Sequence, residues 1–162
     1  MINIYLLVFI LTLLFSTVLV ATKHWHGHYS LDSTFGVQKF HTGATPRIGG
    51  VAIVLGLLVA WLLASPDVRT LLGPMLLAGS PAFAFGLAED LTKHVSVRAR
   101  LLATMASGVL GWALTGVMIT DVNVPGIDWL LGYTVVALAF TAFAVGGVAN
   151  AINIIDLSLI HI

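Results

Sequence analysis

Two adjacent acidic residues, Glu89 and Asp90, follow a long apolar segment and precede several basic residues. Ionisable side chains are costly in or near a membrane, so such a cluster at the end of an apolar segment is a candidate functional site. A second polar series, Asn150, Asn153 and Asp156, closes another apolar segment and recurs every three residues. This spacing places the three side chains along one flank of a helix.

Carboxylates and amides at one membrane face, close to lysine and arginine, suit a hard divalent cation and a polyphosphate. Magnesium prefers oxygen ligands, usually one or two carboxylates completed by the phosphates of a substrate. The metal neutralises phosphate charge and basic side chains stabilise the remainder. The nearby basic residues are Lys93, Arg98 and Arg100.

Simpler interpretations of the same residues remain open. The charges between residues 89 and 100 would also fit a solvated loop that only sets membrane topology. Asn150 and Asn153 would also fit hydrogen bonding across a helix bundle, and Gly146-Gly147 would fit close helix packing alone. The tract Trp25-His26-Gly27-His28 has poor spacing for a metal site, and we expect it to be a solvated loop.

The composition is that of an all-α membrane protein. Of 162 residues, 59% are hydrophobic and 9% are charged, whereas soluble domains carry about a quarter charged residues. The formal net charge of zero gives no electrostatic case for binding nucleic acid. The absence of cysteine excludes a disulfide framework and a thiolate zinc cluster.

Five apolar runs predict five membrane-spanning helices in a polytopic bundle. They cover residues 2–21, 48–64, 71–88, 101–119 and 129–155, with turns expected at 65–70 and at Pro125-Gly126. Pro74 and Pro81 are expected to kink the third helix. Six of the seven lysines and arginines fall in the first and third loops, which predicts an N-terminus outside the cytoplasm and both acidic clusters at the cytoplasmic face.

Four motifs in this order resemble the polyprenyl-phosphate N-acetylhexosamine-1-phosphate transferases, which form glycosyltransferase family 4 and include the phospho-MurNAc-pentapeptide translocases. The resemblance covers roughly residues 40 to 156. The motifs are Thr45-Pro46-Arg47-Ile48-Gly49-Gly50, Gly86-Leu87-Ala88-Glu89-Asp90, Ser96-Val97-Arg98-Ala99-Arg100-Leu101-Leu102 and Asn150-Ala151-Ile152-Asn153-Ile154-Ile155-Asp156.

The resemblance implies a bacterial inner-membrane enzyme with a cytoplasmic magnesium site. Such enzymes transfer a sugar-1-phosphate from a UDP-sugar to undecaprenyl phosphate and release UMP, which initiates a lipid-linked cell-envelope glycan. We expect this chain to act in a surface-polysaccharide (lipopolysaccharide O-antigen) or cell-wall peptidoglycan pathway. The expected partners are the UDP-sugar, undecaprenyl phosphate and the lipid bilayer, and a homodimer is left open.

The resemblance also assigns roles by position. Asp90 and Asp156 would be catalytic or magnesium-binding carboxylates. Glu89 would also be catalytic, and it replaces the first residue of an acidic pair that is commonly Asp-Asp. Asn150 and Asn153 would order the site or the nucleotide, and Lys93 matches a lysine of some members. Arg98 and Arg100 would meet phosphates or lipid headgroups.

The family pattern continues beyond Asp156, towards about ten or eleven spans, whereas this sequence ends Leu157-Ser158-Leu159-Ile160-His161-Ile162. We therefore expect residues 1–156 to be the N-terminal half of the enzyme, inactive by itself. We expect residues 157–162 to be a non-native tail, because they resemble a translated sequencing adapter; a natural truncation is the alternative. The rival function is a non-enzymatic membrane scaffold or transporter subunit, in which the carboxylates serve structure or an ion pathway.

Overall fold

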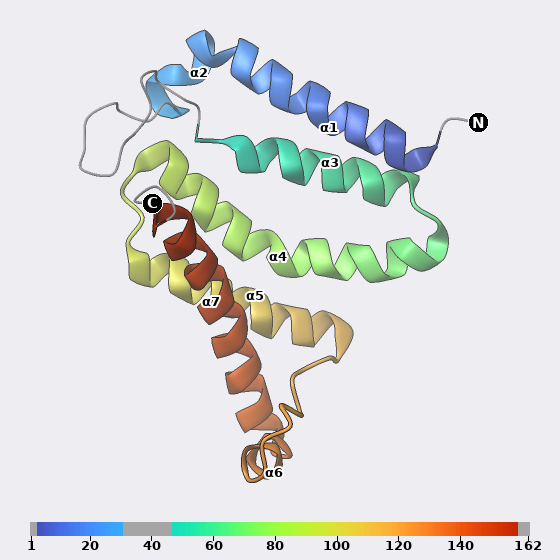
Figure 1. Cartoon of the computed structure of the whole chain (residues 1–162), viewed down its shortest axis with the longest axis vertical. Coiled ribbons are helices and arrows are strands. Elements are labelled where there is room, and N and C mark those ends of the chain that lie inside the picture. The colour runs from blue at the N-terminus through green and yellow to red at the C-terminus, as the bar shows by residue number, and fades with distance from the viewer. Residues whose placement is uncertain (1–2, 31–46, 159–162) are drawn as a thin grey trace. The chain divides into compact units, whose positions relative to one another are not determined.

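The computed structural model describes residues 3–30 and 47–158, and the side chains of residues 3–27 and 47–152. In these residues the chain is helical, without any strand. Figure 1 labels the helices, which are α1 (Ile4–Ala21), α2 (Lys23–Ser30), α3 (Gly49–Leu63), α4 (Pro66–Thr92), α5 (Val97–Thr115), α6 (Ile127–Leu131) and α7 (Thr134–Ser158). The predicted all-α class is confirmed.

Three of the described helices are long and apolar enough to cross a membrane, namely α1, α4 and the Thr134–Ile152 part of α7. Helix α3 is apolar but has only 15 residues, about 22 Å of helix against a hydrocarbon core of about 30 Å. Helix α5 begins with two arginines within its first four residues. The chain is therefore a membrane protein, in which three of the predicted spans are long and apolar enough to cross a membrane and α3 is a shorter apolar helix.

The predicted turn at residues 65–70 is wrong, because α4 already begins at Pro66. Proline at the first helical position has no N–H to leave unpaired, and Asp67 in the first turn interacts favourably with the helix dipole. The long last run is also divided, since α6 ends at Leu131 and α7 begins at Thr134. The turn at Pro125-Gly126 is confirmed, and Gly126 has a φ of 89° that favours glycine.

The histidine tract lies in a helix, not in the predicted loop. Helix α2 follows α1 after Thr22, and His26 Nε2 lies 3.0 Å from the carbonyl oxygen of Leu19 on α1. The side chain of His28, and the whole of His41, lie outside the described residues.

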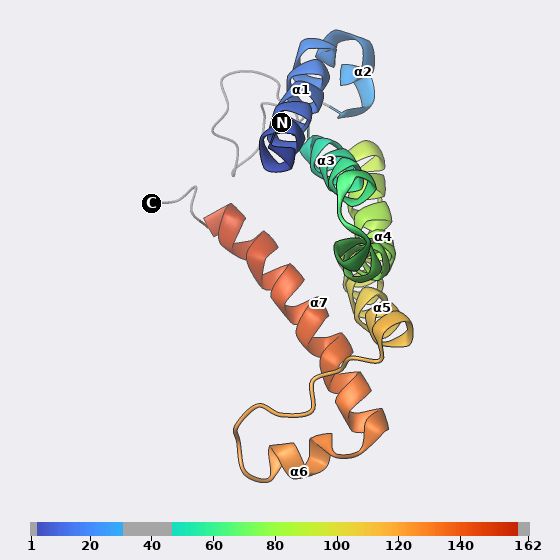
Figure 2. The ribbon, with the colours of Figure 1, turned by 90° about the vertical axis from the view of Figure 1, so that its right-hand side faces the viewer.

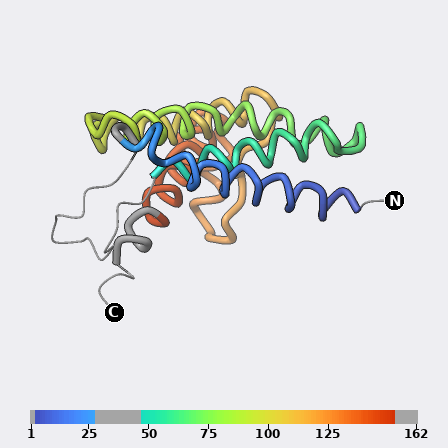
Figure 3. Tube along the Cα trace, turned by 90° about the horizontal axis from the view of Figure 1, so that it is seen from above, coloured from blue at the N-terminus to red at the C-terminus, as the bar shows by residue number. Residues whose placement is uncertain are grey.

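The chain divides into two compact units, one comprising Met1–Gly73 and Gly86–Val95 and the other Pro74–Phe85 and Ser96–Ile162. In the first unit α1 and α3 pack side by side (Figure 3). Ala52 and Gly56 are the buried residues of α3, and a Cβ atom at Gly56 would overlap Thr12 Oγ1 on α1. Small residues at this interface allow the two backbones to approach closely.

In the second unit α5 packs against α7, and α6 precedes α7 at its N-terminal end (Figure 2). Small residues again form the contact: a Cβ atom at Gly108 would lie 3.0 Å from Ala142 Cα, and one at Gly146 would lie 2.8 Å from Met105 Cγ. Buried Thr141 of α7 accepts a hydrogen bond from the Ile119 amide at 2.8 Å, which fixes the segment between α5 and α6 to α7.

Pro81 lies inside α4, as expected, and the carbonyl group that loses its helical hydrogen bond has another donor. Proline cannot donate to the carbonyl four residues earlier, which is that of Leu77. The Ser80 hydroxyl donates to that carbonyl at 2.7 Å. On the next residue, the Ala82 amide donates to the hydroxyl of buried Ser107 on α5 at 3.1 Å. The helix therefore continues through the proline because two serine hydroxyls compensate.

Candidate functional site

Glu89 and Asp90 lie in the last turn of α4 and not in a loop, because the helix extends to Thr92. The expected loop from 89 to 100 is correspondingly short, since α5 begins at Val97. Lys93 ends α4 in the left-handed conformation with φ 57°, and its amide donates to the Glu89 carbonyl at 2.7 Å. The two carboxylates are therefore held on a rigid element, and both are half-buried.

The charges at this helix junction run against the helix dipoles. The C-terminal turn of α4 carries two acidic residues and no basic one, while the N-terminal turn of α5 carries arginine and no acidic residue. A helix C-terminus has partial negative charge and an N-terminus partial positive charge, so each placement is unfavourable by several tenths of a kcal/mol.

Arg47 forms an ion pair with Asp90 inside the first unit. Arg47 Nε lies 3.5 Å from Asp90 Oδ1, and the two side chains are 36% and 31% exposed. Arg47 immediately precedes Ile48, the N-cap residue of α3, so the pair joins the beginning of α3 to the end of α4. Arg47 and Asp90 each lie in one of the four motifs, but nothing else in the sequence predicted that they form a pair.

The polar series of residues 150, 153 and 156 lies on α7, and the predicted helix is confirmed through Ser158. The Asn150 side-chain amide donates to the Gly146 carbonyl of its own helix at 2.8 Å, so its described bond is local and does not cross the bundle. Gly146 packs closely against α5, which confirms the packing interpretation for this glycine, whereas exposed Gly147 has no such neighbour in the described part. The side chains of Asn153 and Asp156 lie outside the described residues.

The predicted site residues fall in two units. Glu89, Asp90 and Lys93 belong to the first, while Arg98, Arg100 and the three polar residues of α7 belong to the second. Their convergence at one membrane face stays a prediction, as does the orientation of the chain in the membrane.

The donor atoms at the end of α4 fit magnesium in chemical type. Within the residues whose side chains are described, no group of three or more His, Cys, Asp or Glu side chains could hold a metal ion. Magnesium nevertheless needs only one or two carboxylates when substrate phosphates complete its shell. Glu89 and Asp90 carry carboxylate oxygens of this type in one helical turn.

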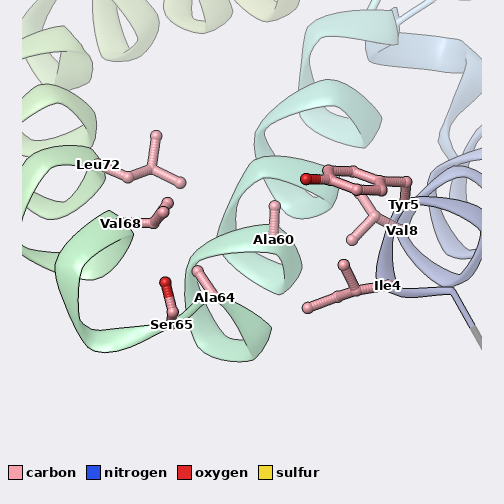
Figure 4. Close-up of a pocket in the computed structure, with 8 residues that line it drawn as sticks. All are labelled: Ile4, Tyr5, Val8, Ala60, Ala64, Ser65, Val68 and Leu72. Atoms are coloured by element: carbon pink, nitrogen blue, oxygen red, sulfur yellow. The ribbon is translucent and has the colours of Figure 1, made fainter.

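A separate pocket lies at the other end of α3 from Arg47. It has a volume of about 460 Å³, and α1, α3 and α4 line it with mainly apolar side chains (Figure 4). The lining residues are Ile4, Tyr5, Val8, Ala60, Ala64, Ser65, Val68 and Leu72. None is acidic or basic, so this pocket does not offer the chemistry of the acidic site.

Sequence reasoning missed the role of Arg69, the one basic residue placed opposite the others. Arg69 Nε donates to the Trp61 carbonyl at 3.1 Å and its Nη2 donates to the Leu62 carbonyl. The Trp61 indole in turn donates to the Arg69 carbonyl at 3.3 Å. Arg69 therefore binds the carbonyl groups at the end of α3 and joins α3 to α4. The feature of the sequence that could have predicted this contact is that Arg69 lies within one turn of Ser65-Pro66-Asp67, where α4 begins.

Comparison with known proteins identifies the family. The model of glycosyl transferase family 4 matches residues 72–157, more than half of the chain. The chain therefore belongs to glycosyl transferase family 4, a family of membrane-bound transferases. No curated protein and no solved structure matches the chain. The match includes the ends of both α4 and α7, whereas the motif at residues 45–50 precedes it.

Proposed function

We propose that the protein transfers a sugar-1-phosphate of the N-acetylhexosamine type from a UDP-sugar to undecaprenyl phosphate and releases UMP. The observation that carries the proposal is the family match, which spans both acidic elements, the end of α4 and the end of α7. The carboxylate pair on the last turn of α4 supports it, because that position suits a cation and a polyphosphate. The family match also disfavours the alternative of a non-enzymatic scaffold or transporter subunit.

The reaction is a phosphoryl transfer that breaks one diphosphate and forms another. An oxygen of the lipid phosphate attacks the phosphorus that bears the sugar, a new P–O bond forms, and the bond from that phosphorus to the UMP oxygen breaks. UMP leaves, and the sugar stays on the lipid through a diphosphate. A phosphate monoester has a second pKa near 6, so much of the acceptor is already dianionic at neutral pH.

In this proposal the chain positions charged groups around the diphosphate. Asp90 and Asp156 would be the principal carboxylates, either holding magnesium or accepting a proton, and Glu89 would support them. Magnesium, when bound, would neutralise phosphate charge. Asn150 and Asn153 would order the end of α7 or the nucleotide. Lys93, Arg98 and Arg100 follow the acidic pair within eleven residues and would contact phosphates.

The proposed setting is the bacterial inner membrane, with the site at the cytoplasmic face. The lysine and arginine distribution supports this orientation. A site at the ends of membrane helices suits a substrate whose phosphate lies in water and whose chain lies in lipid.

The test is UMP release by membranes that contain the product of the gene encoding this chain. Each of a panel of UDP-N-acetylhexosamines is supplied with undecaprenyl phosphate and magnesium, and membranes without the protein serve as the control. We expect release with at least one sugar, only when lipid phosphate and magnesium are both present. Release that does not need the lipid phosphate would indicate hydrolysis and contradict the proposal, and so would no release with any sugar.

A further inference from the structure

We propose that Arg47 is a positioning residue that serves as a built-in counter-ion of Asp90 and is exchanged for a divalent cation when that cation binds. The inference rests on the proposed function, because it takes Asp90 as the carboxylate that meets the cation. It adds a residue that lies outside the part of the chain matched to the family.

The end of α4 is a place of concentrated negative charge. Two successive carboxylates stand in the last helical turn, where the dipole contributes about half a further negative charge. No basic residue lies in that turn, so the nearest compensation along the chain begins only at the C-cap, Lys93. A cation from another element therefore favours the ionised and ordered form of these carboxylates.

Arg47 supplies such a cation from the beginning of α3. Its guanidinium reaches Asp90 across the first unit, so the pair also ties the two helix ends together. Because Arg47 stands just before the N-cap of α3, its backbone is held close to a helix start while its side chain extends to α4. Because Asp90 is the carboxylate that Arg47 contacts, the exchange of arginine for a divalent cation can be tested at Asp90.

The pair is loose enough to be exchanged. The Nε–Oδ1 separation of 3.5 Å exceeds the 2.7–2.9 Å of a strong charge-assisted hydrogen bond. Both side chains are about one third exposed, so solvent reaches the pair and screens it, which limits its contribution to stability. A divalent cation carries twice the charge of arginine in a smaller volume, so it can displace the guanidinium from the carboxylate.

The exchange makes a measurable prediction about metal binding that does not depend on catalysis. Arg47 competes with the cation for Asp90, so removing Arg47 should strengthen cation binding. Because a solvent-screened pair is weak, the expected gain is about two- to fivefold in affinity. Arg47→Lys keeps the charge and should bind the cation with nearly the wild-type affinity.

The experiment titrates the purified full chain in nanodiscs with Mn²⁺, as a paramagnetic substitute for Mg²⁺, and measures free Mn²⁺ by electron paramagnetic resonance. The proteins are the wild type, Arg47→Ala, Arg47→Lys, Asp90→Asn and the Arg47→Ala/Asp90→Asn double variant. Lys23→Ala on α2 is the matched control for losing one positive charge. Circular dichroism confirms helix content, and Arg47→Gln replaces Arg47→Ala if the alanine variant does not fold.

We expect tighter Mn²⁺ binding in Arg47→Ala and no effect of the same change when it is combined with Asp90→Asn. Unchanged or weaker binding in Arg47→Ala would overturn the inference. An equal gain in Lys23→Ala, or in the double variant relative to Asp90→Asn, would overturn it as well. In those cases weaker binding by Asp90→Asn alone would leave the proposed metal site standing. If Asp90→Asn does not weaken binding, both the inference and the metal role of Asp90 fall.

Discussion

At the residue scale, the junction of α4 and α5 shows what single side chains contribute. Acidic residues end one helix and basic residues begin the next, each against the local dipole. The acidic pair and its basic neighbours could be found from the sequence because charges are rare in an apolar chain. The Arg47–Asp90 pair could not, because it joins two residues that are 43 positions apart in the sequence.

The contact between Arg69 and the end of α3 is a second feature of single residues. Arg69→Ala removes both described guanidinium hydrogen bonds to the Trp61 and Leu62 carbonyls. Because the group is exposed, we expect a loss of about 1 kcal/mol in the free energy of unfolding. Thermal unfolding in detergent measures it. Arg69→Lys retains a positive charge near these carbonyls and should lose less; equal stability of wild type and Arg69→Ala would contradict a joining role.

At the element scale, close approach of α1 and α3 depends on Gly56. Gly56→Ala would place a methyl group on Thr12, so we expect a cost of about 1–3 kcal/mol in the free energy of unfolding. Gly79→Ala on α4 is the matched control, because a Cβ atom there meets no described atom within 4 Å. Denaturant titration should show a lower free energy of unfolding for Gly56→Ala and a higher one for Gly79→Ala, since alanine favours a helix over glycine where it meets no clash. A neutral Gly56→Ala would show that the two helices do not pack this closely.

The serine hydroxyls that bond to the backbone around Pro81 are a second feature at the element scale. Ser107→Ala leaves the Ala82 amide without its described acceptor, and we expect a loss of about 0.6–1.7 kcal/mol, the range for hydrogen bonds between membrane helices. Ser107→Cys is the conservative comparison and should recover part of the loss. Unfolding in detergent monitored by circular dichroism gives both values; no change in Ser107→Ala would mean that the bond adds nothing to stability.

Helix types followed from composition more reliably than helix ends. Each apolar run contains a helix, because only helices satisfy their own backbone groups in lipid. The ends were misjudged wherever polar residues continue a helix, as at Pro66, at Glu89-Asp90 and in the histidine tract of α2. Which segments are helical was easier to predict than where each helix begins or ends, because a helix end depends on one or two local hydrogen bonds.

At the scale of the whole molecule, convergence of the α4 and α7 ends can be tested by cross-linking, since the sequence contains no cysteine. We expect Leu91→Cys and Ile152→Cys, both at exposed positions, to be joined by a flexible bis-maleimide in membranes. Leu91→Cys with Val135→Cys is the control, because Val135 lies about 25 Å further along α7. Cross-linking of the control pair alone would contradict a shared site.

Catalysis in the proposed reaction depends on the carboxylates at the ends of α4 and α7. The most direct measurement is lipid-dependent UMP release by the gene product carrying Asp90→Asn or Asp156→Asn, with Asp121→Asn as the control. We expect each of the first two variants to insert normally into the membrane and to lose about a hundredfold or more of the activity, with the control unaffected. Wild-type release by both Asp90→Asn and Asp156→Asn would show that these carboxylates do not carry the transfer.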